Sequence, residues 1–178
     1  MHKELPNRKR NRLGEFNYSA DGEYFITICV KDRKEILSEI VGDDRSDVPM
    51  IKLLPCGEVL DKHIKNMSNS YRKINVFNYV IMPNHVHLIL QIAEENGTSQ
   101  ASSPTKAAIP MFVSQLKRNC NCEYGENIWQ RSYHDRIIRD GNELEKIDTY
   151  IRNNPLLWKE DCFYVVGDDR SDVPQNKA

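Results

Sequence analysis

Two histidines lie two positions apart in the apolar segment 85–92. Such a segment predicts a β-strand, on which alternate side chains point to the same face of a sheet. His85 and His87 therefore share one face of the strand. The other face is assigned to the core and carries Val86, Leu88, Leu90 and Ile92. Two neighbouring imidazoles can ligate a divalent cation and leave positions open for a substrate oxygen. Polar exposure or hydrogen bonding of the pair is the alternative that these residues leave open.

A tyrosine and an asparagine near the end of the chain are spaced four residues apart. Tyr150 and Asn154 share an edge of a predicted helix, which Asn142 can cap and Pro155 should stop. The apolar stripe of this helix consists of Leu144, Ile147 and Ile151. Tyr150 can reach a site across the sheet from this edge. The alternatives are structural: Tyr150 could pack at the edge of the core, and Asn154 could simply be the residue that ends the helix.

The elements that must position these residues follow from hydrophobic periodicity. Predicted strands cover 24–30, 75–82 and 85–92, and predicted helices begin near Pro55 and Pro110. Strand, helix, paired strands and helix in this order favour a ferredoxin-like α+β fold. We expect an antiparallel sheet with helices on one face, and the open face as the working surface.

Composition limits the class of protein. The chain has 178 residues, of which 39% are hydrophobic and 29% charged, and its formal net charge is −1. These values predict one globular domain and argue against a uniformly basic nucleic-acid binder. No apolar run is long enough to span a membrane, and no signal-peptide core begins the chain, so we expect a cytoplasmic protein. Five cysteines without paired metal-ligand spacing are expected to be reduced thiols.

The chain is expected to comprise three parts. A basic tail covers 1–17, a single domain covers 18–165, and a disordered tail covers 166–178. Within the domain, exposed inserts are expected at about 41–49 and, where the composition becomes polar, at about 94–109.

A nonapeptide, VGDDRSDVP, occurs at 41–49 and again, unchanged, at 166–174. Two copies are too few for a stacked repeat architecture. When codons for 42–49 are folded back on themselves, about eleven of the twelve opposed nucleotide positions can be complementary. We hypothesise that both copies are palindromic DNA elements inserted in frame.

Three separated motifs resemble one known family. The segments are YVIMPNHVHLIL at 79–90, IWQRSYHDRIIR at 128–139 and YIRNNP at 150–155, preceded by the early strand at 24–30. Their order and spacing are similar to those of the single-tyrosine HUH transposases, in particular the REP-associated tyrosine transposases, over about residues 18 to 165. The resemblance implies the HUH endonuclease fold.

The resemblance also implies a reaction. Tyr150 would be the nucleophile, and His85, His87 and Asn154 would hold Mg²⁺ or Mn²⁺. The implied enzyme nicks and rejoins single-stranded DNA through a 5′-phosphotyrosine bond, which conserves the phosphodiester energy. Hairpins of palindromic, REP-like repeats are the implied substrate, and family members are monomers or homodimers. The protein would act at the nucleoid.

Clusters of basic residues are candidate DNA contacts. Solvated side chains without a partner are the alternative. Trp129 is assigned to the core, with stacking on a base as its alternative. The candidate basic residues are Arg8, Lys9, Arg10, Arg12, Arg131, Arg136, Arg139 and Arg152.

Two other functions compete with the transposase. A hairpin-binding module derived from such an enzyme would keep the fold without catalysis, but it would not need His85, His87, Tyr150 and Asn154 together. A metal phosphohydrolase would use the histidines with water and leave Tyr150 dispensable.

Overall fold

A four-stranded antiparallel sheet forms the centre of the molecule. In the computed structural model, the chain is described over residues 22–42, 49–70, 73–92 and 108–164. The strand order is β4-β5-β1-β6, and every neighbouring pair is antiparallel. The strands are β1 (Gly22–Cys29), β4 (Ile74–Ile81), β5 (His85–Ile92) and β6 (His134–Ile138). This order and the intervening helices match the ferredoxin-like arrangement, so the predicted α+β fold class is confirmed.

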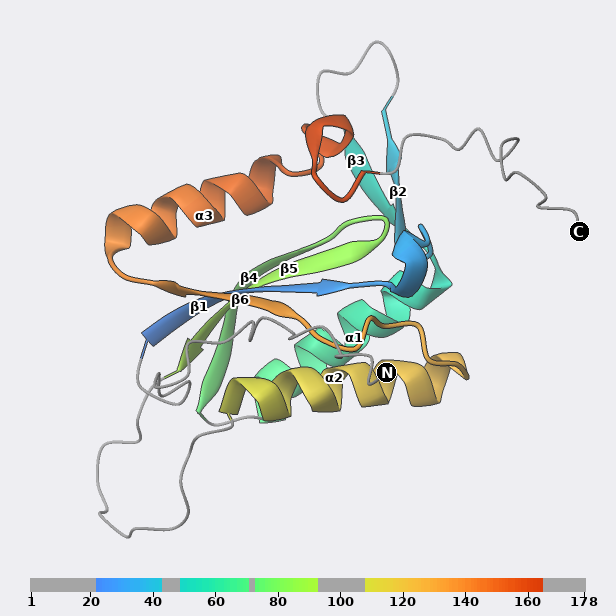
Figure 1. The fold of residues 1–178 in the computed structure, drawn as a ribbon, viewed down its shortest axis with the longest axis horizontal. Helices are drawn as coiled ribbons and strands as arrows, with labels where there is room; N and C mark the ends of the chain where they lie inside the picture. The colour runs from blue at the N-terminus through green and yellow to red at the C-terminus, as the bar shows by residue number, and fades with distance from the viewer. Residues whose placement is uncertain (1–21, 43–48, 71–72, 93–107, 165–178) are drawn as a thin grey trace, which may run out of the picture.

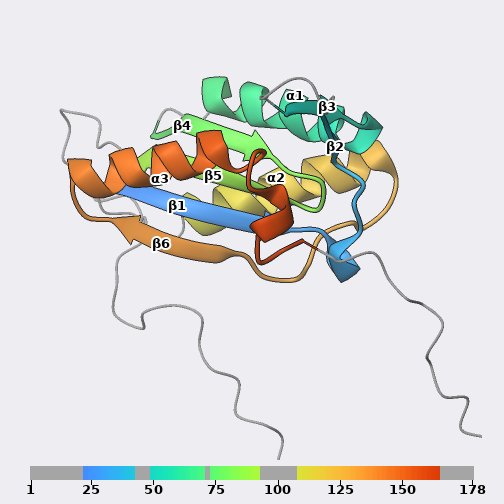
Figure 2. The same cartoon turned by 90° about the horizontal axis from the view of Figure 1, so that it is seen from above.

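The helices lie on both faces of the sheet. Helices α1 (Pro55–Ser70) and α2 (Ala108–Tyr124) pack side by side on one face, as Figure 1 shows. Helix α3 (Gly141–Asn153) crosses the opposite face, over β5 and β1 in Figure 2. The sequence correctly predicted two helices on one face. The other face is not open as expected, because α3 covers it.

Strict alternation along β1 and β5 builds the core beneath α1 and α2. Val86, Leu88 and Leu90 are fully buried there, as their spacing predicted. They pack with the predicted apolar stripe of α1, which consists of Cys56, Leu60, Ile64 and Met67. Gly57 lies where this helix touches the preceding chain, since a Cβ there would be 1.9 Å from the backbone oxygen of Leu37.

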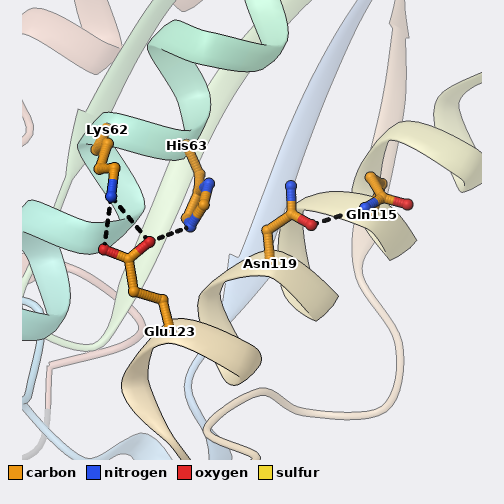
Figure 3. A network of polar contacts seen from close by, with 5 residues as sticks. All are labelled: Lys62, His63, Gln115, Asn119 and Glu123. Atoms are coloured by element: carbon orange, nitrogen blue, oxygen red, sulfur yellow. Dashed lines mark hydrogen bonds and ion pairs between the residues drawn. The ribbon is translucent and has the colours of Figure 1, made fainter.

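A polar cluster joins α1 to α2 at the rim of this core. The Lys62 ammonium donates to both carboxylate oxygens of Glu123, at 2.8 and 3.0 Å, and His63 Nε2 lies 2.9 Å from the same carboxylate (Figure 3). The Lys62 hydrogen bond is the main reason why the pKa of Glu123 is lowered. Asn119 accepts a 2.7 Å hydrogen bond from Gln115 one turn earlier on α2. The cluster fixes the register between the two helices.

A smaller core fills the space beneath α3. Ile147 and Ile151 of the helix are buried against Val80, Met82 and Ile89 of the sheet. Ile147 and Ile151 of the predicted stripe are therefore buried and Leu144 is partly buried, although the N-cap of α3 is not Asn142. Asp140 is the cap, because its side chain accepts a hydrogen bond from Glu143 N–H at 2.9 Å.

A two-stranded ribbon was missed by the sequence analysis. It consists of β2 (Ser38–Val41) and β3 (Met50–Leu53), which flank the first copy of the repeated peptide. Two short 3₁₀ turns complete the structure, η1 (Lys31–Arg33) after β1 and η2 (Trp158–Glu160) after α3.

Several expected segments fall outside the described residues. These are the basic tail at 1–17, the tail at 166–178, most of the insert at 41–49 and most of that at 94–109; α2 already begins at Ala108. The division of the chain into these parts stays a prediction. None of the described helices has the length and apolar character needed to cross a membrane.

Candidate active site

The two histidines of β5 face each other under α3. Their Nε2 atoms are 3.0 Å apart, and the side chains are only 0% and 2% exposed. Burial is the main reason why the pKa of each histidine is lowered to about 3. The positive charge of Arg33 lowers the pKa of His85 further, and His85 does the same for His87. Both imidazoles are therefore neutral at pH 7, which is the form that binds a metal ion.

Asn84 sets the tautomer of His85. Its side-chain amide nitrogen donates to the backbone oxygen of Phe163 at 2.8 Å, so its Oδ1 faces His85 Nδ1 at 2.9 Å. An amide oxygen only accepts, so Nδ1 of His85 carries the proton. The lone pair on His85 Nε2 then points toward His87.

Thr27 is the corresponding partner of His87. It lies directly opposite His87 in the β1–β5 pairing, and its hydroxyl is 2.8 Å from His87 Nδ1. A hydroxyl can donate or accept, so Thr27 permits either tautomer of His87. If Thr27 accepts, the Nε2 lone pairs of both histidines converge on one point. Sequence analysis missed Thr27, which only the strand register identifies.

The predicted tyrosine reaches the histidine pair within the same chain. The Tyr150 hydroxyl is 3.4 Å from His87 Nε2 and 3.3 Å from Asp161 Oδ2, and the side chain is 40% exposed. Burial of the phenol, reinforced by the Asp161 charge, raises the pKa of Tyr150 to about 12. Tyr150 thus combines access to solvent with a position beside the His87 imidazole.

Asp161 is a functional candidate that the sequence did not indicate. Ligand atoms of His85, His87 and Asp161 all lie within 4.8 Å of one another, and they form the one such cluster found among the described residues. Asp161 also accepts a 2.7 Å hydrogen bond from the backbone N–H of Phe163, which fixes its carboxylate. It follows η2 in a polar stretch without periodicity, so only the folded chain reveals its position.

Asn154 lies at the same site, as the helical spacing predicted. It is 1% exposed, and its Nδ2 donates to Asp161 Oδ2 at 3.1 Å. Its Oδ1 is buried and finds no hydrogen-bond partner among the residues that the structure describes. An unsatisfied buried oxygen is costly, so this atom is suited to binding a cation. Two imidazoles, a carboxylate and this amide oxygen are chemically a fitting donor set for a divalent ion.

The candidate DNA contacts are dispersed. Arg136 pairs with Glu143, and Arg152 pairs with Asp148 at 2.6 Å, so the charges of both are partly neutralised. Arg131 and Arg139 are exposed. The described part of the chain does not include the N-terminal candidates Arg8, Lys9, Arg10 and Arg12.

Trp129 is buried in the core beneath α1 and α2, which is the role that the sequence favoured.

Arg33 is a residue of the site that was not predicted. Its Nη1 donates to the backbone oxygen of Cys162 at 3.1 Å, and its guanidinium lies 5.6 Å from the ring centre of Phe163. Since Phe163 also packs against His85, Arg33 is a cation at the rim of the site.

Comparisons with known proteins relate this chain to a family of transposases. The family model described as "Transposase IS200 like" matches residues 18–154. An uncharacterised protein of Haemophilus influenzae is 30% identical over 177 residues, covering 90% of this chain and 95% of its own length. Another protein of that organism, whose name places it among the REP-associated tyrosine transposases, is 24% identical over 146 residues, or 79% of this chain and 73% of its own.

A solved structure extends the comparison to the fold. It shows a REP-associated tyrosine transposase bound to a REP hairpin, and it matches 85% of this chain and 73% of its own with a TM-score of 0.54 at 19% identity. The matched family region contains His85, His87, Tyr150 and Asn154. The family-level resemblance is confirmed, and the chain, which is similar to REP-associated tyrosine transposases, belongs to the IS200-like transposase family.

Proposed function

We propose that this transposase cuts and rejoins single-stranded DNA beside palindromic, REP-like hairpins through a 5′-phosphotyrosine bond. One observation carries the proposal. The Tyr150 hydroxyl lies 3.4 Å from His87 Nε2, and that nitrogen lies 3.0 Å from His85 Nε2, all within one chain. A nucleophile and a pair of metal-ligating atoms are thus close enough to act on one phosphate.

The proposed ligands of Mg²⁺ or Mn²⁺ are His85, His87 and Asn154, to which we add Asp161. When bound, such an ion would polarise the scissile phosphate and offset the charge that develops on it. Asn84 and Thr27 orient the two imidazoles by their hydrogen bonds to Nδ1.

The proposed reaction is an exchange of one phosphodiester for another. The Tyr150 oxygen forms a bond to phosphorus, the bond from phosphorus to the 3′ oxygen breaks, and the phenolic proton ends on the released 3′-hydroxyl. With a pKa of about 12, the phenol is protonated at neutral pH, so it needs a proton acceptor as it attacks. The Asp161 carboxylate, 3.3 Å away, is positioned to receive that proton. Rejoining reverses these steps without a nucleotide cofactor.

The hairpin substrate is supported by the relative whose solved structure contains a REP hairpin. Arg33, an exposed cation at the rim of the site, is suited to a phosphate contact. Chromosomal DNA in the cytoplasm is the proposed place of action.

A covalent adduct tests this proposal. Single-stranded DNA copied from the gene segment that encodes 41–49, with its natural flanks, is incubated with the protein and Mg²⁺ or Mn²⁺ and separated on a denaturing gel. We expect a protein–DNA adduct that disappears in Tyr150→Phe, while binding stays within about twofold because only the hydroxyl is lost. Tyr124→Phe is the matched control, since Tyr124 is similarly exposed, at 37%, but lies on α2.

Two outcomes would contradict the proposal. Cleavage that survives Tyr150→Phe would indicate a metal phosphohydrolase. Binding without cleavage by the wild-type protein would indicate a hairpin-binding module.

A further inference from the structure

A hollow opens beside the end of β1. Its volume is about 710 Å³, and its lining includes Lys31, Lys117, Asn121, Asn127, Trp129 and Arg131. A hollow of this size is within the range of ligand sites. It lies between the turn that follows β1 and the segment that joins α2 to β6, and the reaction proposed above does not use it.

Backbone contacts make this hollow a fixed part of the fold. The N–H of Lys31 donates to Ile128 O at 2.7 Å, and the N–H of Gln130 donates to Cys29 O at 2.9 Å. Lys117 reaches the same segment from α2, since its ammonium donates to the backbone oxygens of Gln130 and Ser132, at 2.8 and 2.7 Å. The walls are therefore held by hydrogen bonds to the sheet and to a helix.

Cations dominate the lining. Lys117 is half-buried and its ammonium uses two of three N–H donors on backbone oxygens. Lys31 and Arg131 are exposed, and neither forms an ion pair with any side chain in the described part of the chain. Asp32 is the one acidic residue of the lining. The net charge of the hollow is positive, which favours an anionic ligand.

The turn after β1 connects the hollow to the histidine site. Asp32 and Arg33 have φ values of 57° and 53°, a left-handed conformation that costs free energy in residues other than glycine. The turn directs Lys31 to the hollow and Arg33 to the rim of the histidine site. Since Cys29 pairs with His85, Lys31 lies only two residues, or about 7 Å of extended chain, beyond the residue that faces His85.

We infer that this hollow holds an unpaired nucleotide of the DNA strand whose neighbouring phosphodiester lies at the histidine pair. The inference rests on the proposed function. Lys31, Lys117 and Arg131 provide phosphate contacts. The exposed amide of Asn127 accepts from Asn121 at 3.2 Å, and its Nδ2 makes no hydrogen bond within the described residues, so it is free to read a base edge. The hollow therefore selects the nucleotide next to the cleaved bond.

A selection from randomised DNA tests the inference. The probe is a pool of single-stranded hairpins with ten random nucleotides on each side, bound to the full-length protein and sequenced after capture. We expect the wild-type protein to enrich one or two flanking positions about tenfold. Asn127→Ala should lose the base preference, and the double variant Lys31→Ala/Arg131→Ala should lose both preference and affinity.

Arg118→Ala is the matched control, because Arg118 is an exposed cation on α2 that does not line the hollow. It should keep the wild-type preference. A wild-type protein that enriches no flanking position, or a preference that survives both hollow variants, would overturn the inference. Adduct formation with the same pool is scored separately: loss of every adduct refutes the proposed function, whereas adducts without a flanking preference refute the hollow alone.

Discussion

The Thr27 hydroxyl is the hydrogen-bond partner that allows His87 to carry its proton on Nδ1. A bound cation requires the Nε2 lone pair, and Thr27 must then accept from Nδ1. Thr27→Val keeps the shape but leaves Nδ1 without a partner, so we expect Mn²⁺ affinity to fall about tenfold or more. A Mn²⁺ titration followed by electron paramagnetic resonance measures this. Thr149→Val, at an exposed position of α3, is the control, and equal affinity of the two variants would exclude the role of Thr27.

Asp161 is the proposed ligand that distinguishes the folded site from the sequence motif. Asp161→Asn removes one negative charge while keeping the side chain's size, so Mn²⁺ should bind at least about tenfold more weakly in the same titration. The neighbouring Glu160→Gln, which changes an exposed carboxylate in the same way, should bind normally. An affinity of Asp161→Asn within twofold of the wild type would remove Asp161 from the ligand set.

Protonation of the buried histidines should destabilise the metal-free protein in acid. Their pKa values fall from an ordinary 6.5 to about 3 on folding, so the unfolded chain binds more protons between these values. The free energy of unfolding is therefore unaffected by this difference above pH 6.5, and it decreases progressively as the pH falls from 6.5 toward 3. Urea unfolding midpoints, measured with a chelator at pH 7, 5.5 and 4, should fall more steeply for the wild type than for the double variant His85→Gln/His87→Gln. Parallel pH profiles for the two proteins would be incompatible with this shift.

The resemblance to a transposase family made His85, His87, Tyr150 and Asn154 candidates, and strand and helix periods indicated which of them share a face. Sequence reasoning missed Thr27 and Asp161 for a physical reason. Thr27 reaches the site through the register of β1 against β5, and Asp161 reaches it through the irregular chain after α3. Neither relation is local in the sequence.

At the level of elements, the long and strongly periodic segments were predictable. The segment 85–92 is a strand at the bounds that the sequence indicated, and the helix near Pro55 extends only three residues beyond the predicted stripe. The β2–β3 ribbon was not predictable, since each strand has four residues and neither is apolar throughout. The face occupied by α3 was also not predictable, because a helix stripe does not say which sheet face it will cover.

The close packing of α1 against the chain before β2 predicts that a larger residue at position 57 will destabilise the protein. Gly57→Ala would place a Cβ 1.9 Å from the Leu37 oxygen, and the backbone would have to shift. We expect a loss of about 1–3 kcal/mol in the free energy of unfolding. Gly141→Ala is the control, because a Cβ there meets nothing within 4 Å and should leave stability unchanged or slightly raise it. Urea unfolding compares the two, and equal stabilities would contradict the close contact.

For the whole molecule, the repeated nonapeptide links the protein to its own gene. Neither copy is described as a complete segment in the structure, so its origin must be read from DNA. If both copies are inserted palindromes, the codons for 42–49 and 167–174 should retain about eleven complementary pairs among twelve opposed positions, third positions included. Sequencing the gene measures this directly. If the third codon positions of these segments are not complementary, an origin from palindromic DNA is rejected.

The position of Asp161 beyond the last family motif affects how relatives should be judged. The family match ends at residue 154, seven residues before this carboxylate. A homologue chosen for its two histidines, its tyrosine and its asparagine can therefore look intact and still lack the carboxylate that contacts the phenol at 3.3 Å. Sorting active from decayed copies in a genome would need the downstream segment as well, placed on the fold rather than aligned by motif.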